Sequence, residues 1–182
     1  MQRPTDTLRA EHAVVGRGLA ALAAIGSHVR AGGALPAADV ATLLRFLREF
    51  VVPIHMRKEA EVVWPAVALR ADETAAACIG DLCRLHTEVT ELVHALVLFW
   101  EPAGDLLPEE RAGFAATVDA ITTRMQRMQR LEEDELFAAC DAAVPADDQL
   151  DWNERFAELA AGREDHGAWA RRIAGVAGTW LH

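Results

Sequence analysis

A histidine and a glutamate four residues apart, His55 and Glu59, stand in the stretch HMRKEAEVVWP at residues 55–65. In a helix with about 3.6 residues per turn the two side chains share one face, so both can reach a single point inside a helical bundle. An imidazole nitrogen and a carboxylate oxygen placed in this way can act as two ligands of one metal ion. Ordinary surface helices carry the same spacing, where it gives only modest side-chain contacts. The pair by itself leaves both interpretations open.

Two further histidines and a second glutamate occupy related positions. His12 and His86 fall in the first and third expected helices, each near the level that an antiparallel neighbour would present. In MQRMQRLEEDELF, at residues 125–137, Glu132 stands five positions before an aromatic residue, as Glu59 does. Imidazole and carboxylate ligands together suit iron, manganese or zinc, and burying two carboxylates without a cation is costly. These residues favour a metal site, and a metal-free bundle with partly exposed histidines is the alternative.

Several other polar residues are expected to lie outside such a site. Of the acidic run EEDE at 132–135, only Glu132 is expected to point inward. Four histidines lack a partner at ligand spacing and are interpreted as surface or core residues: His28, His94, His166 and His182. An odd number of cysteines without CxxC spacing supports neither a disulfide framework nor a zinc knuckle. The three are expected to be small buried residues: Cys78, Cys83 and Cys140.

Turn residues divide the chain into helical stretches that would carry these side chains. The expected helices are 5–31, capped by Thr5 or Asp6; 36–70, with Pro36 in its first turn and a bend at Pro53; 73–100; and 108–142. A last helical stretch, 148–181, is expected to be interrupted at Gly162 and Gly167. Because short loops make consecutive helices antiparallel, the pattern predicts an all-α, up-down-up-down four-helix bundle over residues 1–144. Residues 145–182 are expected to form a C-terminal helical extension that packs on the bundle.

Composition and charge narrow the classes of protein. The chain has 182 residues, of which 52% are hydrophobic and 6% aromatic, with no tyrosine, and this favours helices over strands. Its net charge of -10 repels nucleic-acid phosphates and anionic lipid surfaces, so neither partner is expected. No apolar run approaches a membrane span, and the first residues do not resemble a secretory signal. With no disulfide framework, a cytoplasmic location is expected.

The order of these residues over the helices resembles the hemerythrin-like HHE cation-binding domains, across residues 5 to 142. That family carries a histidine in helix one, HxxxE in helix two, a histidine in helix three and HxxxE in helix four. The resembling segments are RAEHAVV with His12, HMRKEAEVVWP with His55, Glu59 and the pair Trp64-Pro65, LHTEV with His86, and MQRLEEDELF with Glu132. The resemblance implies that His12 and His55 serve one metal ion, that Glu59 and Glu132 bridge, and that His86 is nearly alone on the second ion.

Two positions depart from the family pattern. Met128, four residues before Glu132, stands where the family has its fourth-helix histidine, and a thioether is a weak ligand for iron. The oxygen-carrying members add a histidine one turn after the helix-three histidine, where this chain has Thr90. The two metal positions are therefore expected to be unequal. The residues that could complete the second position, among which the spacing selects none, are Glu91, Glu133, Glu135 and His94.

The resemblance implies a non-haem iron protein with one or two iron ions, and manganese or zinc as alternative metals. Its expected role is to bind or sense oxygen, nitric oxide, peroxide or iron itself. An enzyme that reacts with peroxide or oxygen would need an open coordination position, which the missing histidine could supply. In a third interpretation the metal site is degenerate and the bundle binds a protein partner through Trp152, Trp169 and Trp180. Tryptophans at such positions are more typical of helix packing. The sequence selects no oligomeric state.

Overall fold

The computed structural model describes residues 3–69, 73–100, 106–143 and 145–181, and every regular element within these ranges is a helix. The first segment is α1 (Pro4–Arg30) and the third is α5 (Glu73–Trp100). The second segment runs through α2 (Ala37–Phe46), η1 (Leu47–His55), α3 (Met56–Lys58), η2 (Glu59–Val63) and α4 (Trp64–Ala68). The fourth segment runs through α6 (Pro108–Leu131), η3 (Glu132–Leu136) and α7 (Phe137–Ala143). Two shorter helices follow, α8 (Ala146–Ala160) and α9 (His166–Trp180), and elements labelled η are π-helical.

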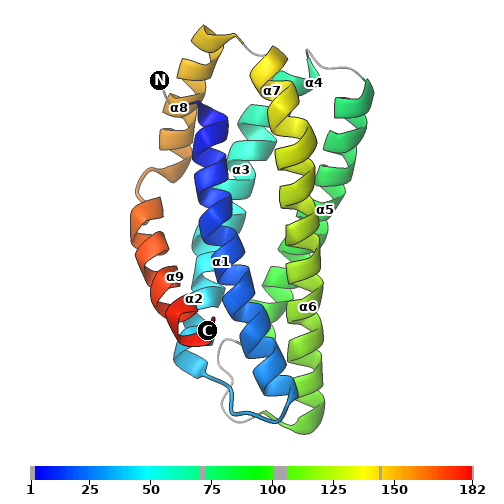
Figure 1. Ribbon diagram of the computed structural model, residues 1–182, viewed down its shortest axis with the longest axis vertical. Coiled ribbons are helices and arrows are strands. Elements are labelled where there is room, and N and C mark those ends of the chain that lie inside the picture. The colour runs from blue at the N-terminus through cyan, green and yellow to red at the C-terminus, as the bar shows by residue number, and fades with distance from the viewer. Residues whose placement is uncertain (1–2, 70–72, 101–105, 144, 182) are drawn as a thin grey trace.

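The four segments run alternately down and up the long axis of the molecule (Figure 1). α1 descends, the second segment returns, α5 descends and the fourth segment rises again. α1 packs against α6 and α9, and α5 packs against α6. This arrangement confirms the predicted all-α, up-down-up-down bundle. It also brings residues that are distant in sequence to the same level of the interior.

Apolar residues at helical spacing form the core of the bundle. In α1, Leu8, Val15 and Leu22 are each at most 1% exposed, because residues three, four and seven apart share the face that points inward. Burying a side chain of this size contributes about 1.5–3 kcal/mol relative to leaving it exposed. A Cβ atom at Gly18 would lie 3.1 Å from Cε1 of Phe46. Glycine at this position therefore lets α1 approach the second segment closely.

Two helix starts differ from the prediction. α1 begins at Pro4, and Arg3 occupies its N-cap position in place of the predicted Thr5 or Asp6. Proline suits the first helical position because the N–H that it lacks would have no partner within the helix. Asp6 lies in the first turn, where its carboxylate accepts a hydrogen bond from the backbone N–H of Arg3 at 3.0 Å. In the second segment, Pro36 is itself the N-cap residue and the helix starts one residue later.

The helix irregularity expected at Pro53 takes the form of a π-helical segment. η1 contains this proline. Because proline has no backbone N–H, it cannot complete an ordinary α-helical hydrogen bond, and a wider turn changes the register around it. Two more π-helical turns begin at Glu59 and Glu132. Single wide turns of this kind occur often at functional sites.

α8 and α9 form a C-terminal extension that lies along the bundle beside α1 and the second segment (Figure 1). The turn between the two helices contains Gly162 with a φ of 71°, a backbone conformation that favours glycine. The predicted interruption at Gly162 is therefore confirmed. The predicted interruption at Gly167 is wrong, because α9 begins one residue earlier and the side chain of Asp165 caps it by accepting a hydrogen bond from the N–H of Ala168.

The tryptophans of the extension serve helix packing. Trp152 and Trp169 are 5% and 1% exposed, and the Trp169 ring lies 5.5 Å from that of Phe46. The indole N–H of Trp180 donates a hydrogen bond to Asp39 at 2.8 Å. Because two of the three rings are buried against the bundle, the three do not form an exposed docking surface.

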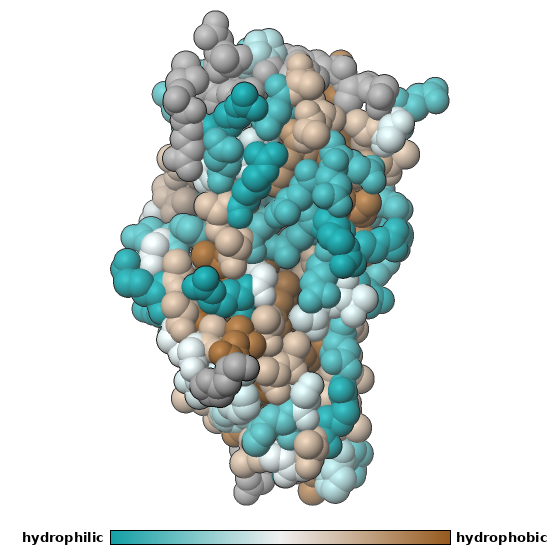
Figure 2. Space-filling model, viewed as in Figure 1, coloured by the Kyte–Doolittle hydropathy of each residue, from teal (hydrophilic) through white to brown (hydrophobic). Residues whose placement is uncertain are grey.

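Hydrophilic residues cover much of the face shown in Figure 2, with smaller apolar areas between them. Within the described residues, we find no helix that has both the length and the apolar character of a membrane span. All three cysteines are free thiols. Cys78 and Cys140 are buried as predicted, whereas the prediction for Cys83 is wrong because this side chain is exposed on α5.

Candidate metal centre

Side chains from all four bundle segments converge at one level of the interior. His12 comes from α1, His55 and Glu59 from the second segment, His86 from α5 and Glu132 from the fourth segment. Four of them are at most 3% exposed, whereas the His86 side chain is 12% exposed. The structure thus brings together all five residues that the sequence singles out, and we call them the cluster.

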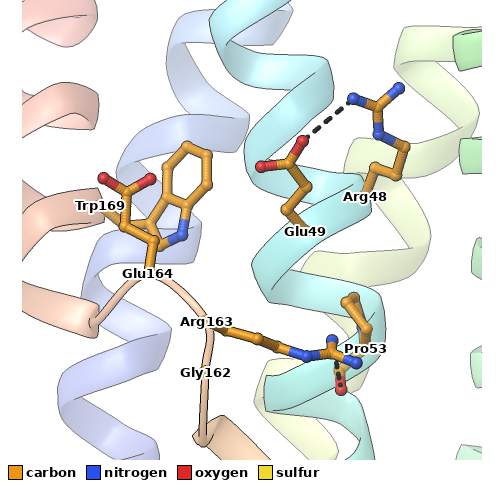
Figure 3. Close-up of a pocket in the computed structure, with 7 residues that line it drawn as sticks. All are labelled: Arg48, Glu49, Pro53, Gly162, Arg163, Glu164 and Trp169. Atoms are coloured by element: carbon orange, nitrogen blue, oxygen red, sulfur yellow. Dashed lines mark hydrogen bonds and ion pairs between the residues drawn. The ribbon is translucent and has the colours of Figure 1, made fainter.

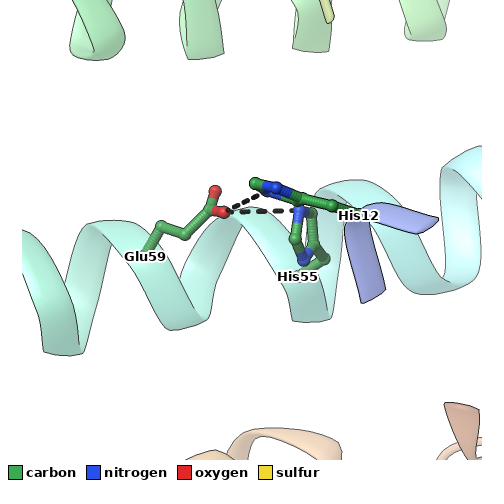
Figure 4. A group of neighbouring side chains, drawn as sticks. All are labelled: His12, His55 and Glu59. Atoms are coloured by element: carbon green, nitrogen blue, oxygen red, sulfur yellow. Dashed lines mark hydrogen bonds and ion pairs between the residues drawn. The ribbon is translucent and has the colours of Figure 1, made fainter. Parts of the chain in front are cut away.

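The cluster consists of two groups that share one glutamate. One group contains His12, His55 and Glu59 (Figure 4), and the other contains Glu59, His86 and Glu132. Within each group, one nitrogen or oxygen atom from every residue lies within 4.8 Å of the others. Each group could therefore surround one cation, with the shared carboxylate between two neighbouring ions.

Glu59 occupies the middle of the cluster. Its Oε1 atom lies 3.3 Å from Nε2 of His12 and 3.3 Å from Nε2 of His55, and its Oε2 atom lies 3.3 Å from Nε2 of His86. Oε2 of Glu132 lies 3.2 Å from Nε2 of His12, and its Oε1 lies 3.8 Å from Nε2 of His86. The same nitrogen of all three histidines is therefore directed toward the carboxylates.

Three polar atoms of the cluster are buried without a hydrogen-bond partner among the described residues: Oε2 of Glu59, Nε2 of His86 and Oε1 of Glu132. All three belong to the group that contains His86. Leaving a buried polar atom unpaired costs about 1–3 kcal/mol, and more for a charged group. A cation at this position would pair with all three atoms, so the donor set fits a metal ion.

The cluster also perturbs the ionisation of its members. Burial alone would lower the pKa of His12, but hydrogen bonding and charge from Glu132 and Glu59 outweigh it and raise the pKa to about 10. Burial likewise disfavours the charged form of His86, but the negative charges of Glu59 and Glu132 outweigh it and raise the pKa to about 9. Burial disfavours the charged form of Glu59, yet the neighbouring imidazoles of His55, His12 and His86 hold its pKa well below its usual range. Protons on the imidazoles thus balance the carboxylates, and a bound metal ion would replace those protons.

Irregular turns set the directions from which three of these side chains enter the cluster. His55 is the last residue of η1, Glu59 is the first of η2 and Glu132 is the first of η3. A π-helical turn holds an extra residue and so changes which side chains face the interior. Pro53 is the only sequence signal for one of these turns, and we recognise no comparable signal for the other two.

Two further carboxylates contact histidines of the cluster at Nδ1, the ring nitrogen that does not face Glu59. Nδ1 of His55 lies 2.9 Å from Oε2 of Glu11, and Nδ1 of His12 lies 2.8 Å from Oε1 of Glu133. A carboxylate in this position fixes which ring nitrogen carries the proton and leaves the other free to bind metal. Glu11 is buried and also pairs with the buried ammonium of Lys58. Neither Glu11 nor Lys58 was predicted from the sequence, because their ion pair joins two helices across 47 positions.

Aromatic rings cover two of the histidines. Trp64 lies against His86 with ring centroids 4.3 Å apart, and Phe137 stacks on His12 at 5.4 Å. Both aromatic residues are buried and shield the cluster from water. Each stands five positions after a glutamate of the cluster, so the repeated spacing in the sequence has a physical basis in this packing.

Other residues considered from the sequence lie outside the two groups. Met128 is 1% exposed and belongs to neither group. The carboxylate of Glu133 contacts Nδ1 of His12, whereas Nε2 of that ring faces Glu59. Three further candidates for the second position are exposed: Glu91, Glu135 and His94. His28 packs beside Trp180 and His166 beside Phe50, as expected for residues without a ligand role, and His182 lies outside the described residues.

A surface pocket of about 540 Å³ adjoins the group that contains His86. His86 lines this pocket, together with residues of the second segment and of α5: Val52, Pro53, Met56, Arg57, Ala60, Thr87, Thr90 and Glu91. Because His86 belongs both to the cluster and to the pocket wall, the pocket offers a small molecule a route from solvent toward this side of the cluster.

An antiparallel four-helix bundle in which every segment projects a histidine or a carboxylate inward is an arrangement in which helical proteins build metal centres. The family model for the hemerythrin HHE cation binding domain matches residues 3–140. The chain therefore belongs to the hemerythrin HHE cation-binding domain family. Neither the curated proteins nor the solved structures contain a significant match to the sequence. α8 and α9 lie beyond the matched residues.

Proposed function

We propose that this chain binds non-haem iron at the cluster, with room for two ions. His12, His55 and Glu59 would hold one ion, and Glu59, His86 and Glu132 would hold the other. The observation that carries this proposal is the division of Glu59 between the two groups, with Oε1 facing His12 and His55 and Oε2 facing His86. Glu132 also spans the two groups, which supports a second bridge. Manganese and zinc accept the same ligand types and are the alternative metals.

The role that this centre supports is the binding or sensing of oxygen, nitric oxide, peroxide or iron itself. Iron would supply redox chemistry and open coordination positions for a small ligand. Three imidazoles and two carboxylates leave such positions, particularly on the side of His86, where Met128 replaces the family histidine. The pocket beside His86 supports this side as the approach route, because its wall includes apolar side chains such as Val52 and Met56.

Metal analysis of the full chain, purified aerobically, tests this proposal together with an absorption spectrum. We expect iron at about two ions per chain and a near-ultraviolet charge-transfer band from carboxylate and imidazole ligands. Metal at trace level after incubation with ferrous iron would contradict the proposal. If the chain retains zinc or manganese and has no affinity for iron, the cluster is a non-redox cation site and the proposal of iron binding is wrong.

A peroxide-reacting enzyme is the second candidate function. The pocket favours it, because the pocket reaches the cluster at the proposed metal position that has one histidine where the other has two. Steady-state consumption of peroxide by the iron-loaded chain, abolished in a Glu59→Gln variant, would distinguish an enzyme from a sensor. The alternative role, in which the tryptophans of the C-terminal extension bind a protein partner, is not supported, because Trp152 and Trp169 are buried.

A further inference from the structure

The C-terminal extension contacts the part of the second segment that carries two cluster residues, 55–59. From the turn after α8, Arg163 donates a hydrogen bond to the backbone carbonyl of Pro53 at 3.3 Å (Figure 3). From within α8, Arg155 donates to the carbonyl of Glu61 at 3.2 Å. Both acceptors lie in π-helical turns, the first in η1 and the second in η2. The extension therefore braces this segment on both sides of its cluster residues.

A third contact lies between these two and leads to a histidine of the cluster. The ring of Phe156 from α8 lies over the ammonium of Lys58, with 5.3 Å from Nζ to the ring centroid. Lys58 is 5% exposed and forms an ion pair with Oε1 of Glu11, which is itself 1% exposed. The other oxygen of Glu11 lies 2.9 Å from Nδ1 of His55. A continuous series of contacts thus joins the extension to the cluster.

The physical effect of this series depends on the exclusion of water. A buried ion pair is stronger than an exposed one, and a buried carboxylate that loses its cation becomes strongly unfavourable. Lys58 therefore holds Glu11 in place, and Glu11 accepts the Nδ1–H of His55 so that Nε2 is free for metal. Phe156 covers Lys58 on the side of the extension. His12 differs, because its supporting carboxylate, Glu133, is 46% exposed.

We propose that the C-terminal extension is a positioning element of the metal centre, which acts through Phe156, Lys58 and Glu11 to hold His55 in its metal-binding orientation. This inference rests on the proposed metal-binding function. It assigns a role to residues beyond the range that matches the family. It also predicts that contacts made by α8 change metal affinity although α8 contributes no ligand.

The test compares ferrous iron affinities of full-length variants, measured without oxygen against a competing chelator. Glu11→Gln should weaken binding by about 10- to 100-fold, the usual effect of losing a carboxylate behind a metal-binding histidine. Phe156→Ala should weaken it by roughly 2- to 30-fold, the range of a cation–π contact from exposed to desolvated. Ile173→Ala is the matched control, because Ile173 is 0% exposed in α9 and packs against Gly18 of α1. Its affinity should equal that of the unaltered chain.

A double variant tests whether Phe156 affects the cluster through Lys58 and Glu11. Phe156→Ala should add no further loss in the Glu11→Gln background, because the ring acts through the Lys58–Glu11 pair. Phe156→Tyr keeps the ring and should restore affinity and the near-ultraviolet band, since a pocket of about 290 Å³ beside Phe156 leaves space for the hydroxyl. Should Phe156→Ala fail to fold, Phe156→Leu keeps the apolar cover and should still bind more weakly than Phe156→Tyr.

Two results would overturn the coupling: equal losses in Phe156→Ala and Ile173→Ala, or additive losses in the double variant. Unchanged affinity in Phe156→Ala together with a loss in Glu11→Gln would limit the positioning role to Glu11 and overturn the part assigned to the extension. An unaltered chain that binds no iron would overturn the metal site itself, and with it this inference.

Discussion

Oε2 of Glu59 lies 3.3 Å from Nε2 of His86, and neither atom has a hydrogen-bond partner within the described part of the chain. Their separation is short, but the directions of the two groups do not form a hydrogen bond. A cation that contacts both atoms would remove the cost of leaving them unpaired. Because Glu59 also faces His12 and His55, both proposed metal positions depend on this one carboxylate.

Replacing Glu59 should therefore empty both positions. In Glu59→Gln we expect bound iron to fall from about two ions per chain to near zero, because the amide cannot bridge two cations as a carboxylate does. Glu61→Gln is the control, since Glu61 is an exposed residue of the same segment paired with Arg57. Metal analysis of both variants is the measurement, and a normal iron content in Glu59→Gln would refute the bridging role.

Replacing a histidine should reduce the metal content only where the ring belongs to the cluster. His55→Ala should lose most of the bound metal, because it removes one of two imidazoles from the first group. His28→Ala and His166→Ala should keep the metal content of the unaltered chain, since these rings pack against Trp180 and Phe50 instead. A loss of metal in either control would show that the ligand set is wrongly assigned.

Met128 offers a test of the incomplete position. Met128→His should strengthen binding of the second ion, so that about two ions per chain are retained against a competing chelator, and it should strengthen the near-ultraviolet band, because imidazole is a better iron ligand than a thioether. Thermal stability of the loaded protein should rise as well, since a ligand bound only by the folded state adds its binding free energy to folding. Met125→His is the control, because Met125 is equally buried but a further three residues from Glu132. Equal effects in both variants would place Met128 in core packing alone.

Metal loading at pH 7 should release protons. His12 and His86 have pKa values raised to about 10 and about 9, so both rings are charged at that pH before metal binds. A metal ion needs neutral imidazole, and binding both ions should displace about two protons per chain. Calorimetric titration in buffers of different ionisation enthalpy counts these protons. A heat that is independent of the buffer would contradict this expectation.

The same pKa values predict how the stability of the metal-free protein depends on pH. An unfolded histidine has a pKa of about 6.5, so the two raised values stabilise the fold fully below that pH. This contribution declines as the pH rises and is lost once the pH passes the folded-state values of about 9 for His86 and about 10 for His12. Urea midpoints should therefore fall between pH 7 and pH 10. Midpoints that stay level for the metal-free chain but fall for a His12→Asn, His86→Asn double variant would contradict the assignment.

Periodicity along the chain was sufficient to predict the bundle and the shared face of His55 and Glu59, whereas the full set of five cluster residues also rested on the resemblance to the HHE domains. A helix places residues three and four apart on one face whatever surrounds it, so the apolar stripe of α1 and the pair His55 and Glu59 can be recognised locally. The inward direction of Glu132, alone within its acidic run, was predicted from the repeated spacing to a following aromatic residue and from the family resemblance, and it is confirmed. The exposure of Cys83 and the continuity of α9 through Gly167 were predicted wrongly, because both depend on how a helix face meets its neighbours.

The sequence by itself thus determined which residue types stand at ligand spacing and which helices carry them. Only the tertiary structure decided that Glu11 supports His55 across 44 positions and that Lys58 reaches the same carboxylate across 47. The physical reason is that such contacts depend on the rotation and register of one helix against another, which side-chain packing sets over the whole interface. The contact between Phe156 of α8 and Lys58 depends in addition on the packing of the extension along the bundle.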